Sequence, residues 1–247
     1  MYQSDSYFDE QGNRQSQGDF SKYEINPYLE YGLSDSLTLG VNLFAQYLQQ
    51  DVSETINFGQ RGSITHHYTA ENIGLTDSEL FARQRLWQRN GLVISFQPLV
   101  KFPSLYHADH LPKGGSDSFD IENSLLTGYS FPLWDRYHFI DLRLGYRHRL
   151  DTLLNDQIKA DAKLGIAIDE SWYLIPAITY THATAHTPQI AFAESGLNDY
   201  DLLKLECSVL FRVNPELYFS AGAFAHASGT NTGEGYGIMI STGWQLQ

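Results

Sequence analysis

The stretch from Lys22 to Tyr31 reads KYEINPYLEY, and apolar and polar side chains alternate along most of it. After a short turn, residues 37–47 read LTLGVNLFAQY and repeat this pattern. Side chains on a strand point to opposite faces with a period of two residues, so each stretch predicts a long β-strand with one apolar and one polar face. A transmembrane β-barrel requires this alternation, because one face meets lipid and the other a polar lumen.

The composition is typical of such a barrel. Charged residues make up 18% of the 247 residues, below the usual ~25%, and aromatic residues make up 14%. The mean hydropathy is −0.33, and no apolar run approaches the ~20 residues that a spanning helix needs. The formal net charge of −13 argues against nucleic acid as a partner. The single cysteine, Cys207, excludes an internal disulfide framework.

The alternation recurs along the chain, where it predicts twelve strands joined by short turns and longer polar loops, residues 50–75 among the loops. This asymmetry is expected of periplasmic turns and outer loops, and single-chain bacterial barrels have an even number of strands. We therefore predict a 12-stranded antiparallel transmembrane β-barrel that occupies residues 1–247 as a single all-β domain. The predicted strands lie near residues 1–8, 19–31, 36–49, 76–88, 92–103, 118–131, 137–149, 157–168, 172–183, 200–213, 216–227 and 235–246.

Aromatic residues and the N-terminus bear on the location of the protein. The tryptophans all fall near the short-turn end of the predicted barrel, and they are Trp87, Trp134, Trp172 and Trp244. Tryptophan gathers at membrane interfaces because its ring is apolar with a polar edge. The first residues, MYQSD, lack the basic start and apolar stretch of a secretory signal. We therefore expect a protein of the bacterial outer membrane whose signal peptide has been removed.

Assigning the more apolar face of each strand to lipid places the charged side chains in the lumen. A charge on the lipid face costs ~2–4 kcal/mol at the bilayer midplane, so this sorting is expected of a barrel. Neighbouring strands then carry opposite charges, which either brace a narrow lumen as ion pairs or select a polar solute as charge rings do. The predicted lumen lining is Glu24, Glu79, Arg83, Arg85, Asp120, Glu122, Asp141, Arg143, Arg147, Arg149, Lys159 and Lys163.

One short motif suggests enzymatic chemistry. His226-Ala227-Ser228 resembles the His-x-Ser arrangement of outer-membrane lipid hydrolases, in which a histidine activates a serine nucleophile. Those hydrolases act toward the outer leaflet and carry Asn after the Ser, whereas the predicted strand turns both side chains inward and Gly229 follows Ser228. We therefore predict no catalytic residues and no enzyme.

Histidines gather in the predicted outer loops, and imidazole is a common metal ligand. The loops offer no carboxylate at clear ligand spacing, so we predict no metal and no cofactor, although the pattern leaves metal binding there open. These histidines are His66, His67, His107, His110, His182 and His186.

Several segments resemble a known family. Residues 7–13 (YFDEQGN), 22–24 (KYE), 30–33 (EYGL), 74–80 (GLTDSEL) and 139–147 (FIDLRLGYR) are similar to Gram-negative outer-membrane barrels of the phenol meta-pathway transporter family and related uncharacterised barrels. The resemblance covers most of the chain and consists of strand patterns rather than catalytic signatures. It implies a twelve-stranded barrel that acts as a passive channel for small or hydrophobic organic molecules. No functional residue carries over from it.

The sequence therefore predicts an outer-membrane β-barrel channel that conducts small molecules passively across the outer membrane. The expected partners are outer-membrane lipid and a small-molecule solute, and no nucleic acid. Two alternatives stay open: a pore that exports a surface polysaccharide, which implies a periplasmic or glycan-export partner, and an outer-membrane lipid hydrolase. The sequence predicts neither the solute nor whether the lumen is plugged.

Overall fold

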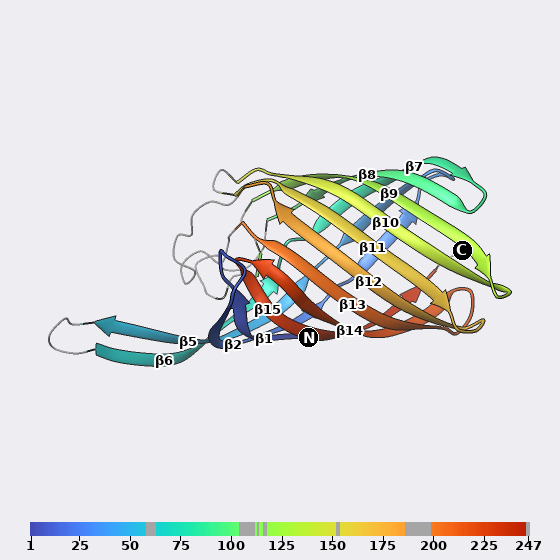
Figure 1. The fold of residues 1–247 in the computed structure, drawn as a ribbon. Coiled ribbons are helices and arrows are strands. Elements are labelled where there is room, and N and C mark those ends of the chain that lie inside the picture. The colour runs from blue at the N-terminus through green and yellow to red at the C-terminus, as the bar shows by residue number, and fades with distance from the viewer. Residues whose placement is uncertain are drawn as a thin grey trace.

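The computed structural model describes the whole chain except residues 58–62, 104–111, 113, 116–117, 152–153, 186–198 and 246–247. Within the described part, fifteen strands form one antiparallel sheet that curls into a barrel (Figure 1). Among the same residues, no helix has the length and apolarity that crossing a membrane requires. The all-β prediction is therefore confirmed.

Successive strands form hairpins along most of the chain. From β7 to β15 each strand pairs with the next one in sequence, and the full order is β3-β4-β7-β8-β9-β10-β11-β12-β13-β14-β15-β1-β2-β5-β6. The strands are β1 (Tyr2–Phe8), β2 (Arg14–Ile25), β3 (Tyr28–Gly32), β4 (Leu37–Asn42), β5 (Ala45–Asn57), β6 (Ser63–Leu75), β7 (Glu79–Arg89), β8 (Leu92–Lys101), β9 (Asp120–Leu133), β10 (Arg136–Arg149), β11 (Gln157–Ala167), β12 (Trp172–Ala183), β13 (Asp201–Arg212), β14 (Leu217–Thr230) and β15 (Thr232–Trp244).

Two chain continuations close the barrel. Strand β1 pairs with β15 on one side and with β2 on the other. Strand β2 runs on through Asn26 and Pro27 into β3, and β4 runs on through Leu43 and Phe44 into β5. Hydrogen bonds connect these breaks, from Leu43 N to Pro27 O at 3.0 Å and from Thr76 N to Phe44 O at 2.7 Å. Strand β3, at one end of the strand order, therefore follows directly from β2, near the other end, and the sheet closes into a barrel.

The predicted count of twelve strands is not supported, because the described residues form fifteen. The predicted strand at 19–31 is divided at Pro27, since proline has no N–H for the ladder. The predicted strand at 36–49 is divided at residues 43–44. Residues 63–75, predicted as loop, form β6.

Strands β5 and β6 extend beyond the barrel at the loop end as a two-stranded ribbon (Figure 1). They pair with each other from Ala45 and Leu75 out to Asn57 and Ser63, whereas β2 pairs with β5 only as far as Gln50. Past that point both faces of the ribbon lack a sheet to pack against. The sequence of β6 therefore lacks the regular alternation from which the other strands were predicted.

The two faces of the barrel wall differ in polarity. Along β9, Asp120, Glu122 and Ser124 are 1%, 0% and 1% exposed, whereas Ile121 and Leu125, which point to the other face, are 41% and 48% exposed. Polar side chains are thus buried on the inner face and apolar ones are exposed on the outer face. Transmembrane barrels have this arrangement, which is the reverse of the arrangement in a soluble sheet.

The tryptophans lie at the short-turn end, as predicted. Trp134 is in the turn between β9 and β10 and is 79% exposed, and Trp244 ends β15 and is 72% exposed. Trp172 begins β12, and Trp87 lies near the end of β7. The barrel thus carries a ring of exposed indoles at one rim.

Candidate functional site

Ion pairs gather on the inner face of β7 to β11, at the end of these strands nearest the long loops. The register brings them together, because Lys101 lies opposite both Glu79 and Asp120, and Glu122 lies opposite Arg147. Strands that alternate faces in register place all of these side chains on one side of the sheet. The members of this loop-end charge cluster are Glu79, Lys101, Asp120, Glu122, Arg143, Arg147, Lys159 and Asp161.

Arg147 stands at the centre of the loop-end charge cluster. Its Nε donates to Oε2 of Glu122 at 2.8 Å, and its Nη2 donates to Oε1 of Glu79 at 2.8 Å. Glu79 is on β7 and Arg147 on β10, three strands apart and therefore about 14 Å apart along the wall. Their side chains must reach over β8 and β9, so this ion pair narrows the lumen.

Glu122 is the most enclosed carboxylate of the cluster. Its side chain is 0% exposed, and besides Arg147 it has Nη1 of Arg143 at 3.6 Å and Nζ of Lys159 at 3.9 Å. The hydroxyl of Ser124 donates to its Oε1 at 2.8 Å. A buried carboxylate is tolerated only when it is paired and hydrogen-bonded. Several cations together meet that requirement here.

A glycine makes room for this arrangement. A Cβ added at Gly145 would lie 2.6 Å from Oγ of Ser124 and 3.0 Å from Oε1 of Glu122. Any larger residue there would push both groups aside, because real Cβ contacts are longer than this. The glycine in the middle of β10 therefore has a packing role that alternation alone does not predict.

Three further ion pairs involve residues of the cluster. Lys101 is 2% exposed, and its Nζ lies 2.8 Å from Oδ2 of Asp120 and 3.3 Å from Oδ2 of Asp77. Nε of Arg143 donates to Oδ2 of Asp161. Six of the twelve predicted lining residues are thus in one network, together with Lys101 and Asp161.

Two predicted residues lie elsewhere on the inner face and have their own partners. Nη2 of Arg83 is 2.8 Å from Oε1 of Glu30, and its Nε donates to Oε1 of Gln97 at 2.9 Å. Glu24 lies 3.4 Å from Nζ of Lys22 and accepts a hydrogen bond from Gln46. These pairs form no ion pair with the cluster among the described residues.

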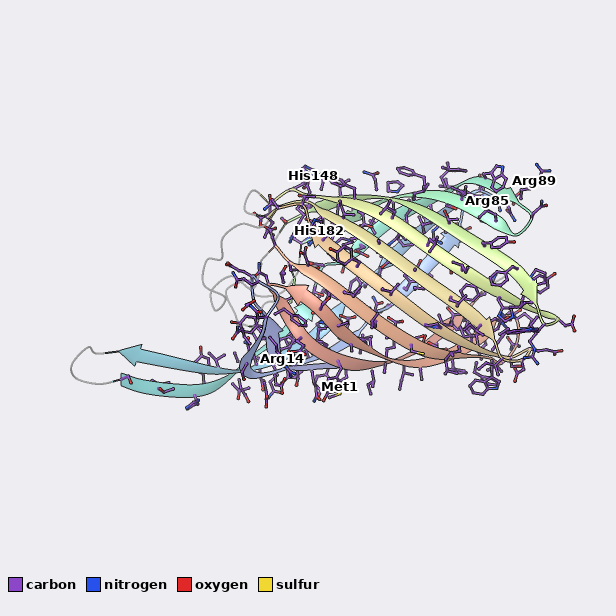
Figure 2. All side chains as sticks on the ribbon, in the orientation of Figure 1. Met1, Arg14, Arg85, Arg89, His148 and His182 are labelled. Carbon is purple, nitrogen blue, oxygen red and sulfur yellow. The ribbon has the colours of Figure 1, made fainter. Side chains whose placement is uncertain are left out.

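The last four predicted residues are less connected. Arg85 lies toward the short-turn end and donates to Gln88 at 2.6 Å (Figure 2). Asp141 and Lys163 lie opposite each other in the register of β10 and β11. Arg149 forms no ion pair among the described residues. The structure therefore places Arg85, Asp141 and Lys163 outside the ion pairs of the loop-end charge cluster, whereas Arg149 lies beside the cluster, opposite Asp120.

A β-bulge separates the two residues of the His-x-Ser motif. The register of β13 and β14 places Lys204 opposite His226 but Leu203 opposite Ser228, with one residue of β14 left over. Because residues opposite each other point to the same face, His226 and Ser228 point to opposite faces. The prediction that both point inward is wrong for Ser228. His226 donates instead from Nδ1 to the carbonyl of Gly233 at 2.7 Å.

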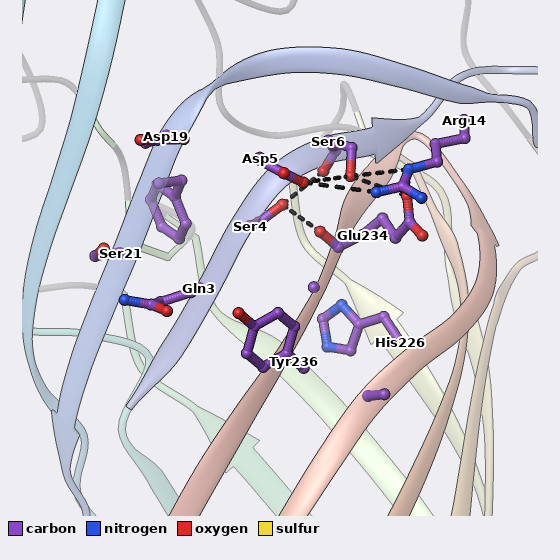
Figure 3. Close-up of a pocket in the computed structure, with 13 residues that line it drawn as sticks. Gln3, Ser4, Asp5, Ser6, Arg14, Asp19, Ser21, His226, Glu234 and Tyr236 are labelled. Carbon is purple, nitrogen blue, oxygen red and sulfur yellow. Dashed lines mark hydrogen bonds and ion pairs between the residues drawn. The ribbon is translucent and has the colours of Figure 1, made fainter.

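A pocket of about 440 Å³ lies beside His226, where β1 bulges against both of its neighbours (Figure 3). Its polar wall is already paired: Nε of Arg14 is 2.6 Å from Oε2 of Glu234, and the hydroxyl of Ser6 donates to the same oxygen at 2.9 Å. The ring of Tyr236 forms part of the lining. With Ser228 on the other face, the His-x-Ser motif does not bring its serine hydroxyl to His226.

The structure covers only part of the predicted loop histidines. Nδ1 of His182 donates a hydrogen bond to Oδ1 of Asp201 at 2.9 Å, and no group of three potential metal ligands occurs among the described residues. His107, His110 and His186 lie outside the described residues.

Comparisons with known proteins bear on the fold. No protein-family model and no curated protein matches the sequence. Among solved structures, an outer membrane channel from Pseudomonas putida F1 is similar with a TM-score of 0.62 at 13% identity, over 97% of this chain and 92% of that chain. A Pseudomonas aeruginosa FadL homologue has a TM-score of 0.46 at 10% identity, over 97% and 70% of the two chains. The first match confirms that the chain has the fold of outer-membrane β-barrel channels.

Proposed function

We propose that the protein is a channel of the bacterial outer membrane that conducts small solutes passively. The carrying observation is the sorting of side chains across β7 to β11, where paired charges occupy the inner face and apolar residues the outer face. Such sorting suits a wall between lipid and a polar path. The likeness to an outer membrane channel and the exposed tryptophan rim support the same location.

We infer that the fifteen strands make twelve passes through the membrane. Strands β2 and β3, β4 and β5, and β6 and β7 are each one course of the chain interrupted by two or three residues. Merging these three pairs leaves twelve courses, in agreement with the predicted barrel. Short breaks in a wall strand are tolerated where neighbouring groups satisfy the backbone, as the hydrogen bonds at Leu43 and Thr76 do.

The predicted lining residues form the wall of this path, with the loop-end charge cluster as its narrow point. Arg147 reaches across two strands to Glu79, which reduces the cross-section at this level. The restriction favours small solutes over a polysaccharide chain. The balanced charges of the cluster suit weak, multiple contacts with a polar solute, because conduction requires that a solute can also leave.

Single-channel recording in planar bilayers tests this proposal. The wild-type protein should give discrete conductance steps, and Arg143→Ala and Arg147→Ala should each shift the reversal potential in a salt gradient toward cation preference. The matched control is Arg89→Ala, because Arg89 is the exposed last residue of β7, at the short-turn end (Figure 2). Its reversal potential should equal that of the wild type.

Two outcomes would contradict the proposal: one concerns the channel function and the other the path that the solute takes. Absence of conductance and of solute flux from correctly folded protein would exclude a channel. Conductance whose ion selectivity ignores both cluster variants would show that the path runs elsewhere than past Arg143 and Arg147.

A further inference from the structure

Arg149 differs from every other basic side chain near the loop-end charge cluster. It is only 9% exposed, and its Nε and Nη1 atoms are buried without any hydrogen-bond partner. It follows Arg147 by two residues on β10 and so lies on the same inner face. Arg147, by contrast, has carboxylate oxygens at 2.8 Å on two sides.

The carboxylate nearest in register is already engaged. Asp120 lies directly opposite Arg149 in the β9–β10 ladder. Its Oδ2 is 2.8 Å from Nζ of Lys101 and 3.9 Å from Nη1 of Arg147, and its Oδ1 has no partner. Lys101 therefore neutralises the group that would otherwise pair with Arg149.

An uncompensated guanidinium in this position is costly. Arginine does not lose its proton in proteins, so Arg149 cannot escape burial by becoming neutral. A buried charge without a partner is strongly unfavourable. The planar guanidinium offers parallel N–H donors that match the two oxygens of a carboxylate. An anion that accepts hydrogen bonds from Nε and Nη1 of Arg149 would therefore stabilise this side chain.

The backbone holds Arg149 at the end of the lumen that a solute from outside would reach first. It is the last residue of β10, and its backbone N–H donates to Oδ1 of Asp156 at 3.0 Å. Asp156 also bonds to Nδ1 of His148 at 2.9 Å, and His148 lies exposed at the loop end (Figure 2). Asp156 thus fixes the strand end and is engaged there.

We propose that Arg149 is an anion-binding site at the loop end of the lumen, where it takes the carboxylate of a small organic anion. This proposal rests on the channel function above and adds the chemical class of the solute. Binding to a single guanidinium is expected to be weak. Weak binding suits a conduction path, because the solute must also be able to leave the site.

Isothermal titration calorimetry on the full chain folded in detergent tests the site without requiring conduction. The probes are butyrate and its neutral isostere butyramide. Butyrate should bind and butyramide should not, and Arg149→Gln should weaken butyrate binding at least about tenfold, since a hydrogen bond to a charged group is lost. Arg149→Lys, which keeps the charge but loses the planar fork, should fall between the two. Arg89→Gln is the matched control and should bind butyrate as the wild type does.

Liposome swelling with the same probes separates this proposal from the channel itself. If the channel conducts, Arg149→Gln should slow butyrate relative to butyramide. Butyrate binding that depends on Arg149, in a protein that passes neither solute, would keep the anion site and exclude the channel. If Arg149 instead turns to the free Oδ1 of Asp120, butyrate affinity will be the same in Arg149→Gln and wild type, and the anion site is overturned.

Discussion

Arg147 and Glu79 stand three strands apart in the sheet, yet Nη2 of Arg147 donates to Oε1 of Glu79 at 2.8 Å. The same guanidinium donates to Glu122, so one cation compensates carboxylates on β7 and β9. This relationship ties non-adjacent parts of the wall together. It also makes Arg147 the residue on which the loop-end charge cluster most depends.

We expect Arg147→Ala to lower the free energy of unfolding by about 3–5 kcal/mol, because removing one partner leaves the other charges buried and unpaired. Urea titration of the protein folded into liposomes, followed by tryptophan fluorescence, measures this change. Arg89→Ala, at the exposed end of β7, should stay within about 0.5 kcal/mol of the wild type. Equal effects of the two substitutions would show that the cluster does not brace the barrel.

Gly165 and Phe139 face each other across β10 and β11, and a Cβ at Gly165 would overlap the Phe139 ring. We expect Gly165→Ala to destabilise the barrel by about 1–3 kcal/mol through overpacking. Gly32→Ala is the matched control, because nothing lies within 4 Å of a Cβ there. In a double-mutant cycle, Phe139→Ala should remove most of the penalty at Gly165. A penalty that persists without the ring would point to backbone strain in place of the ring contact.

The tryptophan rim predicts how deep the short-turn end sits in the bilayer. Trp134 and Trp244 are 79% and 72% exposed, so their indoles are free to contact lipid. In variants that keep one of these tryptophans, lipids brominated near the headgroup should quench fluorescence more than lipids brominated at mid-chain. Stronger quenching by the deeper bromines, or by aqueous iodide alone, would contradict the assigned rim.

Alternation predicted the strands well where one face is covered and the other meets an apolar environment. It located β8 to β13 within a few residues, and it placed Glu122 and Arg147 on one face because a ladder in register leaves no other choice. It missed β6, because residues 65–69 toward the ribbon tip are all exposed, so neither face of this part of the strand is covered. Alternation of apolar and polar residues arises from burial of one strand face, so it does not reveal a strand that buries little surface.

Local shifts of register were beyond reach of the sequence. The bulge in β14 sends Ser228 to the face opposite His226, although the spacing of the two residues predicts a shared face. Likewise, the alternation does not predict that Lys101 pairs with Asp120 at 2.8 Å and leaves Arg149 without a carboxylate. Such details depend on which of several nearby partners a side chain takes, and alternation carries no information on that choice.

Asp156 provides a test of the loop end that depends on pH. Its carboxylate accepts hydrogen bonds from the hydroxyl of Tyr146, from the backbone N–H of Arg149 at 3.0 Å and from Nδ1 of His148 at 2.9 Å. Partial burial raises the pKa of the Asp156 carboxyl, but these hydrogen bonds outweigh burial and hold the pKa below its usual 3.8. A carboxyl whose pKa is lowered by folding stabilises the fold above its unfolded pKa and loses that contribution as the pH falls through the folded pKa.

The free energy of unfolding of the wild type should therefore exceed that of Asp156→Asn at pH 5, and the difference should shrink at pH 3. Tyr146→Phe removes one donor to the carboxylate and should keep part of the pH dependence, because the bonds from Arg149 and His148 remain. Urea titration at the two pH values measures each difference. A gap between wild type and Asp156→Asn that is as large at pH 3 as at pH 5 would mean that the ionised carboxylate does not hold this strand end.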